Sequence, residues 1–254
     1  MTPIILIAGQ TMKELIRDRI LWTFFAAAIG LVILSLLLGS LTFIEHVKIT
    51  IDLGLAMIHI LGLALSVFLG TTLVGKEIRN RTVYAVLARP LSRQEYILGK
   101  FFGLMGIVGL SCIFLSVALL ILLKLLDHMP TQSFFVSLWG ILWEMGVVSS
   151  FALLLSLITS PMVGAFATVG WWAAGTLSTD IYYFAQKSQG AAVEWIGNIC
   201  YYLVPRLDLF AIKNRVVYEA TIPGSEVLQF SFYGTCLVGL LLALSMWIFS
   251  KKEL

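Results

Sequence analysis

A glutamate and a histidine inside long apolar runs are the residues of this sequence best suited to chemistry. Glu144 stands in "LWGILWEMGVV", within the apolar run 134–160, and His59 stands within the run 52–74. If these runs cross a membrane, a rise of about 1.5 Å per residue puts the Glu144 carboxyl about 15 Å deep, near the midplane. An ionisable side chain at that depth is a candidate functional site, so Glu144 and His59 are candidates for substrate contact or coupling. For Glu144, a protonated carboxyl that ties helices together and a carboxyl satisfied by a serine are the structural alternatives.

Other motifs that would carry chemistry are absent or broken. The stretch from Gly70 to Glu77 nearly fits the phosphate-loop pattern G-x-x-x-x-G-K-[ST], but Glu77 replaces the hydroxyl that would hold magnesium. The sequence has no HExxH motif, no G-x-S-x-G elbow and no CxxC pair. It also has no basic patch of the kind that binds nucleic acid. We therefore expect no catalytic site, metal site or cofactor in this chain, and no nucleic-acid partner.

Composition indicates a membrane protein. Hydrophobic residues make up 59% of the 254 residues and charged residues 12%, against about 45–50% and about 25% in soluble proteins. The sequence predicts an all-α, polytopic membrane protein, with residues 1–254 forming one domain with six transmembrane helices. The expected spans are 20–42, 52–74, 96–124, 134–160, 162–184 and 226–249, with a tight turn at Ser160-Pro161. In the third span, Gly99 and Gly103 form a small-xxx-small pair that favours close helix packing.

Residues 1–19 are expected to form an interfacial amphipathic helix. Their first apolar stretch is too short for a signal peptide, and charges follow it. Apolar residues recur at helical spacing, with charged residues mostly on other faces. The expected apolar face comprises Ile4, Ala8, Met12, Leu15 and Ile16.

Basic residues predict the orientation. The N-terminal helix, the segment 76–100 and the C-terminus carry eleven of the seventeen Lys and Arg residues. Cytoplasmic loops carry the excess of these residues, so both termini are expected in the cytoplasm. The segment 185–225 then lies outside, where 191–205 is expected to dip into the outer leaflet as a short helix.

The segment 76–100 concentrates charge between two apolar runs. An arginine at the bilayer centre would cost about 2.5–3.5 kcal/mol, so this segment must lie outside the membrane. Arg89-Pro90 would end a short helix, and Ser92 and Glu95 form an S-x-x-E capping box for the next span. The apolar side of the short helix comprises Ile78, Val83, Val86 and Leu87. Two interpretations remain: a solvated loop that only fixes topology, and a docking surface for a cytoplasmic partner, which the apolar side favours.

The stretch "LVGKEIRNRTVYAVLARPLSRQEYILGK" resembles the segment after the second span of ABC-2-type ABC transporter permeases. The pattern there is roughly E-x4-T-x3-L-x2-P-x-S-R-x5-G-K, and its leucine position is offset here, at Val86-Leu87. The matching residues are Glu77, Thr82, Pro90, Ser92, Arg93, Gly99 and Lys100. The stretches "DLGLAMIHILGLALSVFLG" and "YYLVPRLDLFAIKNRVV" also resemble the branch grouped with multicopper-enzyme-maturation permeases. The resemblance covers nearly the whole chain.

In that family the segment after the second span is a coupling helix that sits in a cleft of a separate ATPase subunit. The resemblance implies that residues 77–90 transmit ATP-driven motion, and that two permeases, identical or homologous, combine with two ATPases. The implied coupling residues are Glu77, Arg81, Thr82, Val86, Leu87, Arg89, Pro90 and Arg93. ATP and magnesium would be bound by the partner, so this subunit would not itself be an enzyme.

The implied function is ATP-driven export from a bacterial cytoplasmic (inner) membrane. Apolar spans with one clear carboxylate favour a hydrophobic or amphiphilic substrate over a sugar or an ion. A stand-alone secondary transporter or channel is the alternative, although it would be expected to carry several intramembrane charges. A further alternative is force transmission to outer partners without movement of any solute.

Overall fold

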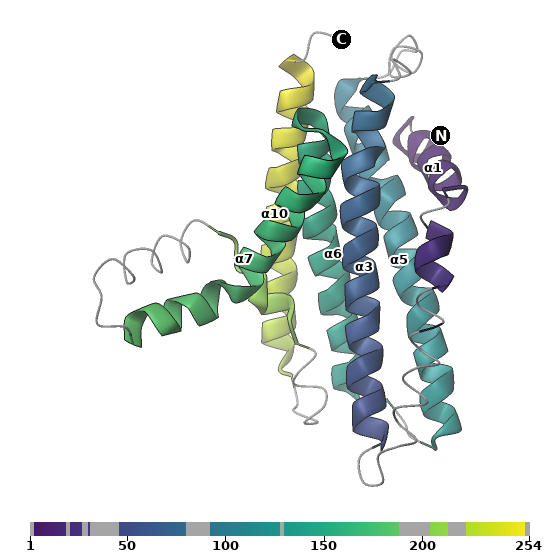
Figure 1. The fold of residues 1–254 in the computed structure, drawn as a ribbon, viewed down its shortest axis with the longest axis vertical. Coiled ribbons are helices and arrows are strands. Elements are labelled where there is room, and N and C mark those ends of the chain that lie inside the picture. Colours follow the sequence, from purple (N-terminus) through teal and green to yellow (C-terminus); the bar gives the residue numbers. More distant parts are fainter. Residues whose placement is uncertain are drawn as a thin grey trace.

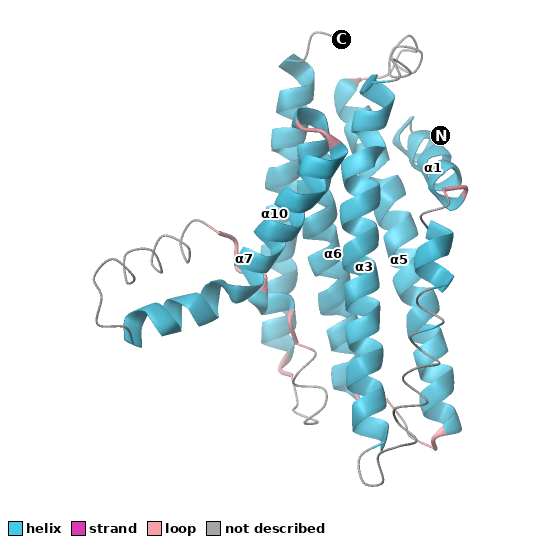
Figure 2. Cartoon of the chain, viewed as in Figure 1, coloured by secondary structure: helices cyan, strands magenta, loops and turns pink. Residues whose placement is uncertain are grey.

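The described part of the chain is entirely helical. The computed structural model describes residues 3–18, 21–26, 30, 46–79, 92–127, 130–187, 204–212 and 222–251. Within these ranges, all regular secondary structure is helix, as Figure 2 shows. The elements are α1 (Pro3–Ile16), α3 (His46–Arg79), α5 (Arg93–Leu125), α6 (Gln132–Ile158), α7 (Pro161–Lys187), the 3₁₀ turn η1 (Asp208–Phe210) and α10 (Gly224–Lys251). The all-α prediction is confirmed for these residues.

Four long helices form the body of the molecule. α3, α5, α6 and α10 run alongside one another (Figure 1), and each is long and apolar enough to cross a membrane. They coincide with four of the predicted spans, namely 52–74, 96–124, 134–160 and 226–249. α7 coincides with the predicted span 162–184 but is not among these four. The predicted span 20–42 lies largely outside the described residues, although 21–26 are helical.

Small residues bring α3 and α6 into close contact. A Cβ atom on Gly70 would lie 2.7 Å from the Cβ of Ala152, and one on Gly75 would lie 3.0 Å from the carbonyl oxygen of Ser156. Such distances leave no room for a side chain on α3, so the two backbones approach through a stripe of small residues. We call this contact the α3–α6 seam.

α1 packs on α5 through the predicted glycine pair. A Cβ atom on Gly99 would lie 2.6 Å from the Cβ of Ile7, and one on Gly103 would lie 2.6 Å from the Cβ of Thr11. The expected close packing at Gly99 and Gly103 is therefore confirmed, and its partner is α1.

The buried face of α1 differs in part from the predicted apolar face. Ile7, Thr11 and Leu15 are the buried residues of the helix. Leu15 belongs to the predicted set, whereas Ile16, also in that set, is 40% exposed. The contact with the glycines of α5 sets the rotation of α1, and spacing along α1 alone does not reveal such a contact.

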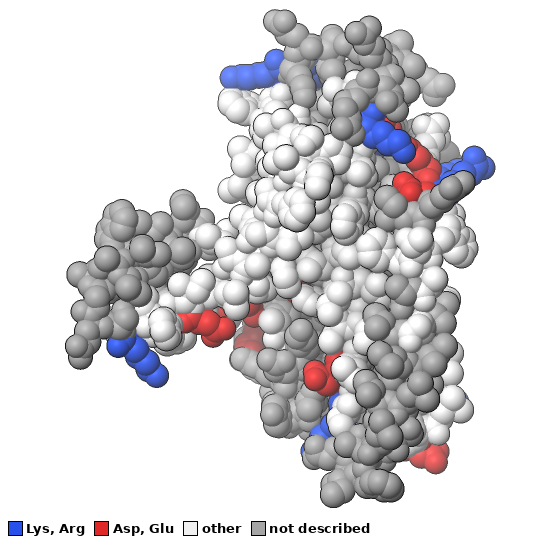
Figure 3. Space-filling model, in the orientation of Figure 1, with Lys and Arg blue, Asp and Glu red and all other residues white. Residues whose placement is uncertain are grey.

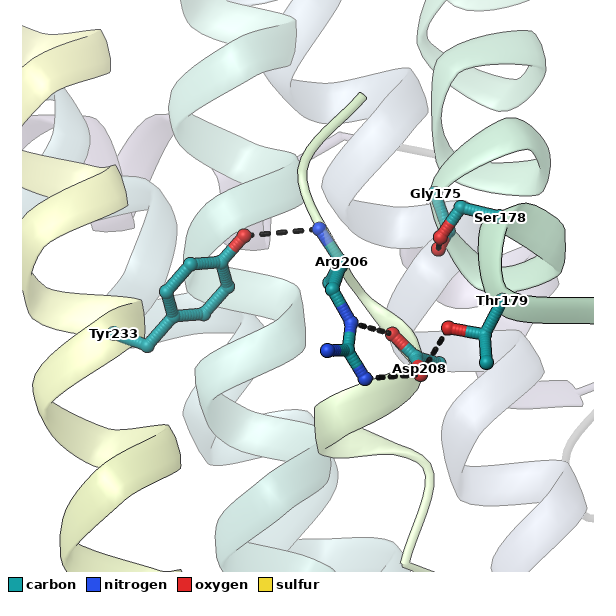
Figure 4. A network of polar contacts seen from close by, with 6 residues as sticks. All are labelled: Gly175, Ser178, Thr179, Arg206, Asp208 and Tyr233. Carbon is teal, nitrogen blue, oxygen red and sulfur yellow. Dashed lines mark hydrogen bonds and ion pairs between the residues drawn. The ribbon is translucent and has the colours of Figure 1, made fainter. Parts of the chain in front are cut away.

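The chain breaks between α6 and α7 as predicted. α6 ends at Ile158 and α7 begins at Pro161, because a proline has no amide N–H to continue the first helix. Only the first half of α7 lies along the bundle, and its second half projects sideways (Figure 1). The ribbon turns away near Thr179, beside the segment 204–212 (Figure 4). The helix predicted at 162–184 is thus present but bent.

The α3–α6 seam predicts a position-specific effect of added bulk. Gly70→Leu is expected to lower the free energy of unfolding by about 1–3 kcal/mol, because the new side chain must displace Ala152. Gly109→Leu on α5 is the matched control, since a Cβ there meets nothing within 4 Å. Both changes improve helix propensity equally. Thermal unfolding in detergent measures the difference, and equal stability of the two variants would contradict the seam.

Candidate functional site

Glu144 and His59 meet inside the bundle. Nε2 of His59 on α3 lies 2.9 Å from Oε2 of Glu144 on α6. Nε1 of Trp172 on α7 donates to Oε1 of the same carboxyl at 2.7 Å. Glu144 is 1% exposed and His59 is 7% exposed. We call these three side chains the Glu144 cluster.

The Glu144 cluster depends on the packing of three helices. A Cβ atom on Gly62, one turn beyond His59, would lie 3.1 Å from the sulfur of Met145, the neighbour of Glu144. The close approach of α3 and α6 therefore places the imidazole against the carboxyl. α7 completes the cluster, with the ring of Trp172 5.9 Å from that of His59.

The cluster satisfies a buried carboxyl without solvent. Both carboxyl oxygens have a polar partner, and these partners are a histidine and a tryptophan rather than a serine. A proton in the pair resides on the imidazole or on the carboxyl, and either arrangement forms a hydrogen bond between His59 and Glu144. Because Glu144 is almost fully buried, no solute touches it in this conformation. These contacts favour the interpretation in which Glu144 ties helices together.

Trp172 is the member of the cluster that sequence analysis missed. A buried indole N–H usually finds an acceptor, so the Trp171-Trp172 pair in a predicted span was a usable signal. The pairing of His59 with Glu144 was also not predicted, although both residues were singled out.

A second polar cluster lies at the end of the bundle where α1 lies and α10 ends (Figure 1). Glu77, near the end of α3, accepts hydrogen bonds from Nζ of Lys100 and from the hydroxyl of Tyr96, both on α5. Nζ of Lys100 also lies 3.5 Å from Oε2 of Glu14 on α1. Lys100 is 5% exposed and Tyr96 is fully buried. This Lys100 cluster joins α1, α3 and α5 beside the two ends of residues 80–91.

The predicted capping box at the start of α5 is confirmed. The Ser92 hydroxyl accepts from the Glu95 amide at 3.2 Å, and the Ser92 amide donates to the Glu95 carboxylate at 2.9 Å. Arg93 donates to the carbonyl oxygens of Phe249 and Ser250 at 3.2 and 2.8 Å. A cation at that place satisfies the last carbonyls of α10. Arg93 therefore joins α5 to the end of α10.

Of the other implied coupling residues, the structure describes only Glu77. Glu77 lies within α3, which runs without a break to Arg79, beyond the predicted span end at 74. The remaining residues lie outside the described part of the chain: Arg81, Thr82, Val86, Leu87, Arg89 and Pro90. Among the described residues, no group of histidine, cysteine and carboxylate side chains could hold a metal ion.

A third polar network lies at the bend of α7 (Figure 4). Asp208 accepts from the hydroxyl of Thr179 at 2.8 Å and from Nη2 of Arg206 at 3.2 Å. The backbone amide of Arg206 donates to the hydroxyl of Tyr233 on α10 at 2.9 Å, and that of Leu207 donates to the Gly175 carbonyl at 3.2 Å. The segment 204–212 is thereby fixed to both α7 and α10. It falls within the predicted outer segment 185–225, of which 188–203 and 213–221 lie outside the described residues. The short helix expected at 191–205 therefore lies outside them except for 204–205.

An apolar cavity of about 470 Å³ opens between α5, α6 and α10. Aromatic and aliphatic side chains form nearly all of its lining. They include Phe101, Phe102, Met105, Trp139, Trp143 and Leu242. A cavity of this kind accepts hydrocarbon and offers little to a polar solute.

Comparison with known proteins does not assign the chain to a family. No protein-family model matches it, and no curated protein is similar to it at a significant level.

The Glu144 cluster predicts a difference between two substitutions of one residue. Glu144→Gln keeps an oxygen acceptor for Trp172 and a polar group beside His59, so stability is expected to change little. Glu144→Leu leaves both partners unsatisfied and is expected to lower the free energy of unfolding by about 1–2 kcal/mol. Thermal unfolding of the two purified variants measures this. An equal loss of unfolding free energy in the two variants would show that the cluster requires the carboxyl group itself.

Proposed function

We propose that this chain is the membrane-spanning permease subunit of an ATP-driven ABC exporter of the ABC-2 type. Two copies, or one copy and a homologous permease, would combine with two ATPase subunits that bind ATP and magnesium. The chain would lie in a bacterial cytoplasmic membrane, with α7 and the run 20–42 completing six spans and with both termini in the cytoplasm.

The observation that carries this proposal is the Lys100 cluster. Glu77 precedes residues 80–91, whereas Tyr96 and Lys100 follow them, and hydrogen bonds tie the two sides together. A loop that only fixes topology needs positive charge, but its two ends need not be held rigidly. A loop that receives force from a partner must have both of its ends fixed to the helices that are to move. Three contacts fix the residues on the two sides of 80–91 in this way. They are the buried Lys100–Glu77 pair, the capping box and the contact of Arg93 with α10.

The apolar cavity supports the proposed class of substrate. Its lining suits the hydrocarbon part of a hydrophobic or amphiphilic molecule and lacks the polar groups that a sugar or an ion would need. It opens between three of the helices that are apolar enough to cross a membrane, so a lipid-like molecule would reach it from the bilayer.

The Glu144 cluster favours a second candidate, a stand-alone secondary transporter. A buried imidazole–carboxyl pair can hold a proton, and such pairs occur in proton relays of transporters. A secondary transporter would move its substrate without an ATPase partner, so dependence on ATP separates the two functions.

The proposed orientation predicts which helix starts face the outside. In a variant with Cys112, Cys200 and Cys236 replaced by alanine, Gln132→Cys should react with a membrane-impermeant maleimide in intact cells. Gln94→Cys should react only after permeabilisation. Both positions are exposed, at the starts of α6 and α5, so accessibility within the fold does not limit either reaction. Reaction of Gln94→Cys in intact cells would overturn the orientation.

The coupling role predicts the effect of carboxylates on the apolar side of residues 77–90. Val86→Asp combined with Leu87→Asp should leave membrane insertion normal, because acidic residues contribute little to orientation. The ATPase subunit should be lost on purification or remain bound with turnover unresponsive to substrate. The physical reason is that an unpaired carboxylate in a protein cleft costs several kcal/mol.

Gln94→Asp is the matched control for that variant, because it adds a carboxylate at an exposed position in the first turn of α5. It should leave ATPase binding unchanged. If the double variant inserts, keeps its partner and transports at the normal rate, residues 77–90 are not a coupling helix and the secondary transporter becomes the better proposal.

A further inference from the structure

A polar pocket of about 270 Å³ lies between the end of α1 and the neighbouring face of α3. It is separate from the three polar clusters described above, apart from Glu14, which it shares with the Lys100 cluster. Figure 3 shows basic and acidic side chains side by side in this region, at the upper right of the view. The lining residues are Glu14, Leu15, Arg17, Asp18, Thr72, Leu73 and Lys76.

The pocket offers charges of both signs. Arg17 and Lys76 are cationic, and among the described residues neither takes part in an ion pair or a side-chain hydrogen bond. Glu14 and Asp18 are the two carboxylates. Glu14 lies 3.5 Å from Lys100, and Asp18 also has a contact within the chain. Each carboxylate has two oxygens and about four lone-pair sites, so each can accept a further donor.

The hydroxyl of Thr72 adds a neutral acceptor. It donates its proton to the Phe68 carbonyl at 2.8 Å, which leaves its oxygen lone pairs for a ligand. The pocket therefore has two cations for an anionic group, and two carboxylates and a hydroxyl oxygen for an N–H donor.

The surroundings of the pocket fit the boundary between headgroups and acyl chains. Phe68 is one helical turn below Thr72 on α3, and its side chain is 46% exposed. The ring of Phe24 lies 5.9 Å from that of Phe68. Trp22 is 62% exposed and donates from its indole to the Ile16 carbonyl at 3.1 Å, and tryptophan is typical of membrane interfaces. An acyl chain attached to a group in the pocket would run along these aromatic residues.

The geometry points to this pocket as a binding site for the phosphoethanolamine headgroup of a membrane phospholipid. Arg17 and Lys76 bind the phosphate through charge-assisted hydrogen bonds. Asp18, Glu14 and the Thr72 oxygen accept hydrogen bonds from the ammonium group. The pocket volume of about 270 Å³ leaves room for a small headgroup of this kind.

The charge balance selects against other phospholipids. A phosphoglycerol headgroup would offer the two carboxylates only neutral hydroxyl donors, which form weaker hydrogen bonds than an ammonium group. A choline headgroup has no N–H to donate to those carboxylates, and quaternary ammonium groups favour aromatic cages. The site requires only that the bundle lies in a membrane, and it is independent of ATPase coupling.

Native mass spectrometry of the full-length, delipidated protein tests the site. The probes are dioleoyl phosphatidylethanolamine, phosphatidylcholine and phosphatidylglycerol added in competition. The wild type is expected to retain phosphatidylethanolamine about tenfold more strongly than either of the others, as the loss of one charge-assisted hydrogen bond implies. This comparison needs no variant. Equal retention of the three lipids, or preference for phosphatidylglycerol, would overturn the proposal.

Two substitutions then separate the two halves of the headgroup. Arg17→Gln should lower retention of all three lipids, because each has a phosphate. Asp18→Asn should lower retention of phosphatidylethanolamine alone by about tenfold. Lys13→Gln is the matched control, since it removes an exposed cation four residues before Arg17 that does not line the pocket. Thermal unfolding of each variant verifies folding, and a loss of retention with Lys13→Gln as large as that with Arg17→Gln would show general charge attraction instead of a site.

Discussion

A polar side chain inside an apolar bundle must find its partners within the protein, because water and lipid there cannot supply them. Among the described residues, the buried histidine, lysine and glutamate side chains follow that constraint, whereas five other buried side-chain polar atoms have no hydrogen-bond partner. Glu144 brings together His59 and Trp172 from two other helices, and Lys100 brings together Glu77 and Glu14. Each cluster fixes the relative position of three helices, so the constraint that makes these residues costly also makes them organise the fold.

Local features of the fold could be predicted well from the sequence. The capping box at Ser92 and Glu95, the break before Pro161 and the small-xxx-small pattern of Gly99 and Gly103 all arise from residues a few positions apart. The apolar runs likewise predicted the four helices that are long and apolar enough to cross a membrane. In each case the physical cause lies within one or two helical turns, which is the range over which a sequence pattern carries information.

The contacts between helices could not be predicted in this way. Glu144 and His59 were recognised separately from their depth, but their pairing depends on the register of α3 against α6, which the small residues at 62, 70 and 75 set. The buried face of α1 depends on the glycines of α5 for the same reason. The bend of α7 depends on the segment 204–212, whose hydrogen bonds to Gly175 and Thr179 join residues far apart in the sequence.

α3 connects the two clusters mechanically. His59 and Glu77 both lie on this unbroken helix, about 27 Å apart along its axis. A displacement applied at Glu77 therefore moves His59. Glu144 moves together with His59, because α3 and α6 cannot shift against each other without a clash at Gly70 or Gly75 in the α3–α6 seam. Trp172 belongs to α7, which is held at its bend by the segment 204–212. The hydrogen bond from Nε1 of Trp172 to Oε1 of Glu144, at 2.7 Å, therefore ties α7 to the α3–α6 pair. The Glu144 cluster thus lies where α3, α6 and α7 meet, so any change in their relative positions must alter the partners of a buried carboxyl.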